Sequence, residues 1–286
     1  MIRAKSLIAL LTISLIVSIA YIDTVHMLSA TYAFRHRVAR KALITNTSLS
    51  LQSICKFLSA QFVMLNDCLG CLRESPIIEP NTCYIQTNWL CMHVLKYLCG
   101  YDELANYIER FLDRFIVDFY DYYQILLGKP FSLPLTTVKQ VIVESINVGE
   151  NKIIIKKLLR TNEVYYDYDK YANLIIYKAI LNLRYGDKES TMSEVEKLKR
   201  LFDGTGFRDL SYKSLHKYET YKLALAIYLY RLLGRDYDAY VRRYVKLINS
   251  IKPFATLYDE RLNGVGDLNI ETACLTAIAL YEIKDM

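Results

Sequence analysis

Along this chain, segments that are apolar on every side alternate with segments that are apolar on one side only. The clearest pair begins at Tyr218, where the apolar residues between 223 and 233 leave no polar face and so predict a buried helix. Gly234 marks its expected end, because glycine readily adopts the left-handed conformation that closes helices. In residues 241–251 apolar side chains recur on one face, which is typical of an outer helix.

The same pairing of an inner and an outer helix returns elsewhere. Inner helices are expected at residues 87–98, 169–183 and 269–283, and outer helices at 102–115 and 191–202. Residues 22–41 and 48–65 also have helical patterns. A recurrence of this kind predicts a helical-hairpin repeat. We therefore predict an all-α fold in which residues 21–286 form one domain.

One segment, residues 130–167, departs from this pattern. Apolar residues alternate with polar ones on both sides of the polar turn at 147–151. A period of two predicts β-strands, so we expect a small β-hairpin near residues 138–160. Insertions into helical repeats often lie on the binding face.

The N-terminal segment, residues 1–20, predicts export. Arg3 and Lys5 precede an apolar run at 7–19, and residues 18–20 place serine and alanine where a signal peptidase reads small side chains. The run is shorter than the ~20 residues of a typical transmembrane helix, so we expect cleavage after Ala20. An uncleaved anchor is the alternative, and it would be the chain's only link to a membrane. Either outcome makes the protein secreted or places it on the extracellular face of the cell membrane.

Seven cysteines follow the predicted signal, and six of them lie between positions 55 and 99. Thiols outside the cell oxidise, so we expect disulfides in the N-terminal third of the chain. The odd total leaves at least one thiol free. Cys91 and Cys274 lie in apolar helices, where unpaired cysteines serve as core residues.

A zinc site is the alternative use of Cys68, Cys71 and Cys83, together with Cys91 or His93. The second half of that set lacks the paired spacing of a zinc finger. The segment 68–71 is also not surrounded by the βαβ pattern of a thioredoxin-like motif. We therefore expect neither a metal nor a cofactor.

The composition is that of a globular protein, with 53% hydrophobic and 23% charged residues. The net charge is +6, but basic and acidic residues alternate along the chain, so we expect no nucleic-acid partner. The chain has 25 tyrosines and one tryptophan. Tyrosine therefore has to supply the aromatic walls of any ligand site.

The residues that open the inner helices resemble those of (α/α) toroid proteins, a group that includes glycoside hydrolases, polysaccharide lyases, and terpene and lanthionine cyclases. The segments that carry this likeness are 86–89, 171–174, 218–222 and 269–273. Over residues 85–286 the chain is also similar to a family of uncharacterised exported proteins from thermophilic archaea, through the segments 202–207 and 267–272. The second resemblance implies export and a helical fold, but no reaction.

The toroid resemblance implies an (α/α) toroid or an incomplete helical-hairpin barrel, in which the first residues of the inner helices line one end of a central cavity. The candidate ligand-binding residues are therefore Asn88, Trp89, Tyr171, Asn173, Tyr218, Lys222, Tyr258 and Asn269. The candidate catalytic residues are Asp169, Glu219, Asp259 and Glu271, because a glycosidase needs one protonated and one ionised carboxyl about 5 to 9.5 Å apart. The alternative role for each acid is to cap its helix, which the helix dipole favours.

Two functions from different classes follow. The first is an exported binding protein that holds an extended carbohydrate or peptide in a cavity lined by tyrosines and carboxylates. The second is a glycoside hydrolase or lyase that acts on polysaccharide. The chain has no His-Glu-x-x-His and no Gly-x-Ser-x-Gly motif, which argues against zinc proteases and α/β-hydrolases. Asp118 and Asp121 are expected on the surface of an outer helix, and Asn46 opens the one glycosylation sequon.

Overall fold

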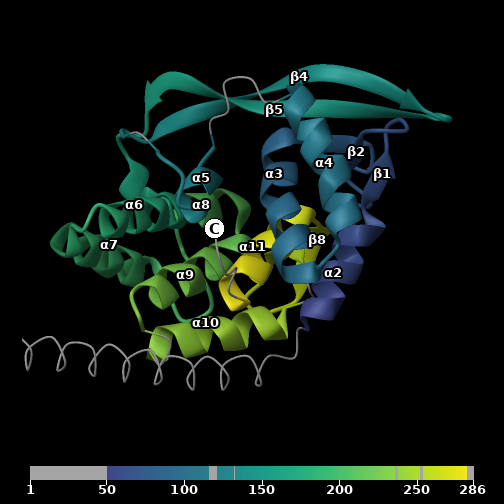
Figure 1. Cartoon of the computed structure of the whole chain (residues 1–286). Helices are drawn as coiled ribbons and strands as arrows, with labels where there is room; N and C mark the ends of the chain where they lie inside the picture. Colours follow the sequence, from purple (N-terminus) through teal and green to yellow (C-terminus); the bar gives the residue numbers. More distant parts are fainter. Residues whose placement is uncertain (1–49, 116–120, 132, 236–237, 252–253, 282–286) are drawn as a thin grey trace, which may run out of the picture. The chain divides into compact units, whose positions relative to one another are not determined.

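A computed structural model describes residues 50–115, 121–131, 133–235, 238–251 and 254–281 (Figure 1). All of these belong to a compact unit, Thr47–Met286. The predicted signal at residues 1–20, the predicted helix at 22–41 and the sequon at Asn46 lie outside the described residues. Among the described residues, no helix is long and apolar enough to cross a membrane.

The helices of this unit follow the predicted inner and outer pairs closely. The inner helices are α3 (Ile85–Val94), α6 (Ala172–Arg184), α9 (Thr220–Leu232) and α11 (Ile270–Leu280). The outer helices are α4 (Asp102–Phe115), α7 (Lys188–Leu201) and α10 (Ala239–Ser250). Shorter helical segments are α2 (Leu51–Ala60), η1 (Leu95–Cys99), α5 (Tyr123–Leu126), η2 (Tyr168–Lys170) and α8 (Leu210–Leu215).

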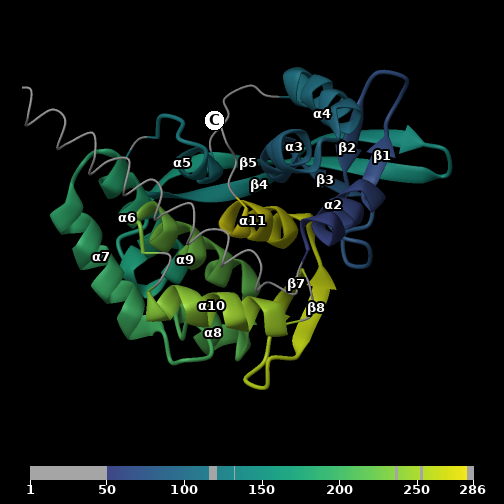
Figure 2. The same cartoon turned by 60° about the horizontal axis from the view of Figure 1, so that its bottom comes forward.

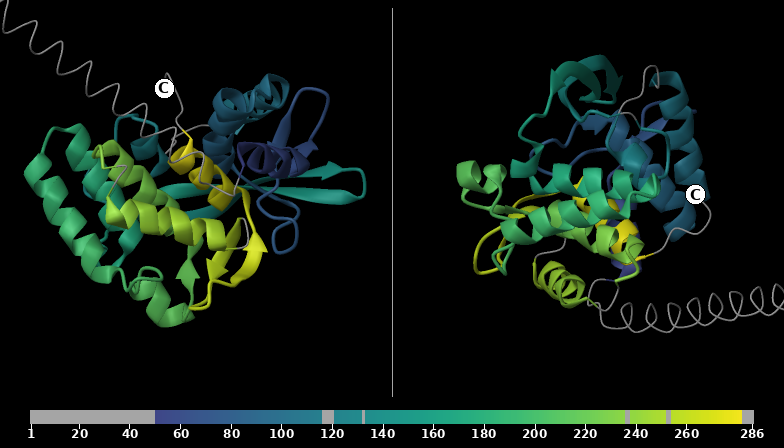
Figure 3. Two further views of the ribbon diagram at one scale, coloured as in Figure 1. Left: turned by 90° about the horizontal axis from the view of Figure 1, so that it is seen from below. Right: turned by 90° about the vertical axis from the view of Figure 1, so that its left-hand side faces the viewer.

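The inner helices pack side by side in the order α6, α9, α11, α3, and each of α3, α6 and α9 also packs against its own outer helix. α11 lies between α9 and the N-terminal elements in Figure 2, and the left view of Figure 3 shows the same arrangement around the yellow helix. Every residue of α11 except Glu271 is buried. The row therefore forms the core, and Glu271 is the one residue of α11 that keeps partial exposure.

Several helix boundaries differ from the prediction by a few residues, and two of them have a clear local reason. The helix expected at residues 48–65 ends at Ala60, because the chain there turns into a short strand. The helix expected to open at Thr191 begins at Lys188, with the Asp187 side chain accepting a hydrogen bond from Ser190 N. Gly100 and Gly234 end their helices with φ of 67° and 68°, as predicted.

The prediction of an all-α fold, an (α/α) toroid or an incomplete helical-hairpin barrel, is wrong. Of the described residues, 52% are helical and 22% lie in strands, and these strands form three sheets. One sheet pairs β1 (Phe62–Met64) with β2 (Gly70–Leu72) in antiparallel fashion. Strands of two to five residues are too short to show an alternating pattern, so the periodicity of the sequence did not reveal them.

The long hairpin is present but larger than predicted, with β4 at Thr136–Val148 and β5 at Asn151–Val164. β3 (Thr82–Tyr84) pairs in parallel with β5, so the hairpin is part of a three-stranded sheet and not an isolated insertion. Figure 1 shows the hairpin running past α3 and α5 at one side of the helices.

A third sheet positions the starts of two inner helices. Its strand order is β6 (Tyr218–Glu219), β7 (Ala255–Tyr258), β8 (Gly264–Leu268). β6 and β8 are both antiparallel to β7, so they run in the same direction and their C-terminal ends lie on the same side of the sheet. α9 follows β6 directly and α11 follows β8 after Asn269, so both helices begin on that side.

Three disulfides join Cys55 to Cys99, Cys71 to Cys83 and Cys91 to Cys274. The interpretation of Cys91 and Cys274 as unpaired core residues is wrong, because they bond to each other and tie α3 to α11. Cys68 is free and exposed. Disulfides persist in oxidising compartments, so the chain belongs to such an environment.

Candidate functional site

Glu219 and Glu271 lie at the starts of α9 and α11, which the third sheet brings together and which pack against each other. Glu219 is the last residue before α9, and Glu271 lies in the first turn of α11. Burial raises the pKa of Glu271, and the Glu219 carboxylate adds to that rise. The structure therefore brings these two acids within electrostatic reach of each other.

The environments of the two carboxyls differ. The Tyr123 hydroxyl donates a hydrogen bond to Oε1 of Glu271. Burial raises the pKa of Glu271, the Tyr123 hydrogen bond opposes that effect, and the net shift is upward. Glu219 Oε2 instead pairs with the ammonium of Lys222, one turn into the same helix. One carboxyl thus has a neutral partner and the other a cation.

Two further acids, Glu74 and Asp121, belong to this group. Burial raises the pKa of Glu74 well above its ordinary value, and the Glu271 carboxylate adds to the effect. Burial also raises the pKa of Asp121 to about 8, again with a contribution from Glu271. We call Glu74, Asp121, Glu219 and Glu271 the carboxyl cluster, and Glu271 is the member that interacts with the other three.

The prediction that Asp121 lies on the surface of an outer helix is wrong. It is 5% exposed, and its Oδ1 accepts a 2.7 Å hydrogen bond from Tyr123 N at the start of α5. The sequence did hold a signal for its burial, because tyrosines and the apolar run 125–127 follow it directly.

Glu74 joins the start of α11 to the first half of the chain. Its backbone oxygen accepts a hydrogen bond from Ile270 N at 3.1 Å, and its Oε1 accepts one from the Asn269 amide at 3.3 Å. The Thr87 side chain in α3 also bonds to the carboxyl and opposes the rise in its pKa. No local pattern around Glu74 indicates this role, because its partners lie far away in sequence.

Tyrosine side chains surround Glu271. Burial raises the pKa of Tyr123, Tyr177 and Tyr221 well above the ordinary value, and the Glu271 carboxylate raises each of them further. Tyr122 stacks on Tyr177 with ring centroids 5.2 Å apart. The raised pKa values keep the hydroxyls of Tyr123, Tyr177 and Tyr221 protonated, and Tyr123 donates its proton to Glu271.

Lys222 is the cation of the site and is 2% exposed. Its Nζ donates to Asp209 Oδ2 at 2.5 Å as well as pairing with Glu219. Asp209 Oδ2 also accepts a hydrogen bond from Ala172 N, the first residue of α6. Asp209 thereby links the starts of α6 and α9 and fixes the lysine that faces Glu219.

The other predicted catalytic acids have different surroundings. Asp169 is exposed within η2. Asp259 holds the β7–β8 turn, where its carboxylate accepts hydrogen bonds from Arg261 N and from Asn263. The Asn263 side chain lowers the pKa of Asp259, as expected for a carboxylate engaged in a turn.

The predicted ligand-binding residues divide into two groups. Asn88, Tyr218 and Tyr258 are buried and bonded within the protein, to the Leu72 backbone, to the Asp203 carboxylate and to the Thr205 carbonyl. The remaining residues at helix starts keep partial solvent access: Trp89, Tyr171, Asn173 and Asn269.

Within the described ranges, no group of three histidines, cysteines, aspartates or glutamates is arranged to hold a metal ion. Comparisons of the chain with protein-family models, with curated proteins and with solved structures found no match. A carboxyl with a raised pKa beside a carboxylate held by an ammonium is an arrangement suited to general acid–base catalysis.

Proposed function

We propose that the chain is an exported enzyme that hydrolyses a glycan, with Glu271 as general acid and Glu219 as general base. The observation that carries this proposal is the unequal partnering of two carboxyls at adjacent helix starts. Glu271 has a tyrosine hydroxyl and a raised pKa, while Glu219 has the Lys222 ammonium. Separated protonation states are what two carboxyls need to act as acid and base at one bond.

In the proposed step, Glu271 gives its proton to the glycosidic oxygen as the bond from the anomeric carbon to that oxygen breaks. A water molecule attacks the anomeric carbon, and its proton passes to the Glu219 carboxylate. The ion pair with Lys222 holds the Glu219 carboxyl in place, and the Tyr123 hydroxyl stabilises Glu271 after it has lost its proton.

A sugar is the favoured substrate because of the side chains at the starts of the inner helices. Tyr171 and Tyr221 are half-buried aromatic residues at the starts of α6 and α9, and Asn173 and Asn269 add amides at the starts of α6 and α11. Aromatic faces with nearby amides suit the apolar faces and hydroxyls of a sugar ring. Secretion is part of the proposal and is supported by the three disulfides and by the predicted signal.

The test is a screen of plant and cell-wall polysaccharides for reducing sugar released by the oxidised, full-length protein. We expect Glu271→Gln and Glu219→Gln each to lower the turnover number by at least about 100-fold, the ordinary contribution of a general acid or base. Asp169→Asn is the matched control, because it neutralises an exposed carboxylate in η2 and should leave activity unchanged. Equal activity of the wild type and both glutamine variants would exclude this mechanism.

A second candidate, a binding protein without turnover, is favoured by the contacts that already engage both carboxyls. Tyr123 donates to Glu271, and Lys222 pairs with Glu219, so both carboxyls are held in fixed positions. From these positions they can accept hydrogen bonds from a bound ligand. The same screen separates the two functions. A polysaccharide that the wild-type protein retains without releasing product supports binding, whereas product release supports hydrolysis.

A further inference from the structure

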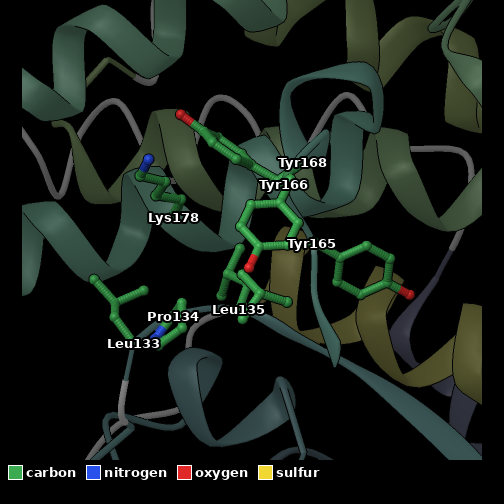
Figure 4. Close-up of a pocket in the computed structure, with 8 residues that line it drawn as sticks. Leu133, Pro134, Leu135, Tyr165, Tyr166, Tyr168 and Lys178 are labelled. Atoms are coloured by element: carbon green, nitrogen blue, oxygen red, sulfur yellow. The ribbon is translucent and has the colours of Figure 1, made fainter. Parts of the chain in front are cut away.

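A cavity of about 460 Å³ lies where the ends of the long hairpin meet α6 (Figure 4). One wall is the apolar segment Leu133, Pro134 and Leu135 before β4, and the opposite wall includes Tyr166 and Tyr168 after β5, with Lys178 from α6. No member of the carboxyl cluster lines this cavity. It is therefore a separate site, and its chemistry differs from that of the cluster.

The polar end of the cavity has a defined structure. Glu194 of α7 is 3% exposed and accepts hydrogen bonds at 3.0 Å from both the Tyr168 hydroxyl and Lys197 Nζ. Lys197 Nζ also donates to the Tyr168 hydroxyl at 2.8 Å. Lys178 Nζ lies 3.5 Å from the same Glu194 carboxylate. Two ammonium groups thus share one carboxylate, which leaves a net charge of +1 at this end.

Lys178 is the group that a ligand can reach. Its Nζ lies 3.8 Å from the centre of the Tyr168 ring, and its side chain keeps 28% of its surface exposed. In the part of the chain that the structure describes, its ammonium makes the Glu194 ion pair and this ring contact but no hydrogen bond. Its protons are therefore available to an anionic ligand, while the Tyr168 hydroxyl is fully used by Glu194 and Lys197.

The mouth of the cavity presents apolar surface to solvent. Tyr166 is 89% exposed and Leu133 is 47% exposed. A tyrosine ring in full contact with water, beside an apolar wall, provides a surface on which a ligand ring can stack. The volume also lies within the range of about 300–1,000 Å³ that is usual for small-molecule sites.

We propose that this cavity binds a small organic monoanion: an aromatic ring that carries one carboxylate. The ring would stack on Tyr166 and contact Leu133 and Pro134, and the carboxylate would accept hydrogen bonds from Lys178 Nζ. The single net positive charge matches one carboxylate, and the apolar wall favours an aromatic body over a sugar ring.

The experiment compares 4-phenylbutyrate with its neutral amide, 4-phenylbutyramide, by isothermal titration calorimetry on the oxidised full-length protein. We expect the carboxylate to bind at least about tenfold more tightly than the amide. Lys178→Gln should remove this preference, and Tyr166→Ala should weaken both ligands. Lys170→Gln is the matched control, since Lys170 lies two residues from Tyr168 and is 62% exposed in an ion pair outside the cavity wall.

The proposal is supported if the carboxylate binds saturably and is preferred over the amide by Lys170→Gln but not by Lys178→Gln. Equal affinity for the carboxylate and the amide in the wild type overturns it, and so does an unchanged preference in Lys178→Gln. Absence of saturable binding by either compound overturns it as well. Because the carboxyl cluster lies elsewhere, none of these results depends on whether the protein hydrolyses a glycan.

Discussion

The ammonium of Lys222 lies 2.5 Å from Oδ2 of Asp209, and both side chains are almost completely buried. The pair joins α9 to the segment that opens α8, and through Ala172 N it also reaches the start of α6. Charged groups this deeply buried are stable only when they are paired and hydrogen-bonded. The pair therefore holds the start of α9, where Glu219 of the carboxyl cluster lies.

Asp209→Ala should lower the free energy of unfolding by about 3 kcal/mol or more, because it leaves the Lys222 ammonium buried with one fewer partner. Urea denaturation at neutral pH measures this change. The control is Glu196→Ala, which breaks the ion pair between Glu196 and Lys199. The Glu196 side chain is 60% exposed, so this substitution should change the free energy of unfolding by about 1 kcal/mol at most. Equal effects of the two substitutions would contradict a structural role for the buried pair.

Stability should also depend on pH through Asp121. Its pKa is raised from an ordinary value of 3.8 to about 8 in the folded protein, so between these values the folded state binds a proton that the unfolded state has lost. The contribution to stability is therefore fully present below about pH 4 and is lost as the pH rises toward about 8. In Asp121→Asn the side chain keeps an oxygen that can accept the hydrogen bond from Tyr123 N, but the side chain can no longer ionise.

We expect the wild-type free energy of unfolding to fall between about pH 5 and about pH 8, with a smaller fall in Asp121→Asn. Urea denaturation at a series of pH values provides both curves. Glu74 and Glu271 also have raised pKa values, so part of the slope should remain in the variant. Parallel curves for the two proteins would show that Asp121 ionises normally.

The buried helices could be predicted because each carries its pattern within one continuous segment. The apolar stretch after Glu219 and the one after Glu271 identified both helix starts and, with them, the two acids at the centre of the site. The sheet that joins these starts could not be predicted, since β6 is only the two residues Tyr218 and Glu219. A two-residue strand has no periodicity, and its partner β7 follows nearly forty positions later.

The buried acids could not be predicted for a related reason. Glu74 owes its burial to Asn269 and Ile270, which lie more than 190 residues further along the chain. The pattern around Glu74 describes only a polar loop. Sequence periodicity shows which face of a helix or strand is apolar, but long-range contacts determine which carboxyl in a loop is buried and desolvated.

The three disulfides can be tested by chemical labelling. Cys68 is the one free thiol, so alkylation of the unreduced, denatured protein should modify one cysteine, and mass spectrometry of peptides should locate the label at Cys68. The disulfide Cys91–Cys274 spans 183 residues and should contribute about 2–5 kcal/mol of stability. Replacing both cysteines by alanine should lower the melting temperature, whereas Cys68→Ala should leave it unchanged.

Tyr123→Phe tests the environment of Glu271 directly, without reference to any substrate. The Tyr123 hydroxyl lowers the pKa of Glu271 by donating a hydrogen bond to its carboxylate, while burial and Glu219 raise it. Removing the hydroxyl should therefore move the pKa of Glu271 further upward, because the ionised carboxylate loses one hydrogen bond. Titration by nuclear magnetic resonance of protein labelled with carbon-13 glutamate measures this pKa, and the resonance lost in Glu271→Gln identifies the signal.

Tyr221→Phe is the matched control, since no hydrogen bond joins that tyrosine to Glu271 among the described residues. A Glu271 pKa that stays constant in Tyr123→Phe would mean that the hydroxyl does not bond to the ionised carboxylate, and Tyr123 would then lose its place beside the proposed acid.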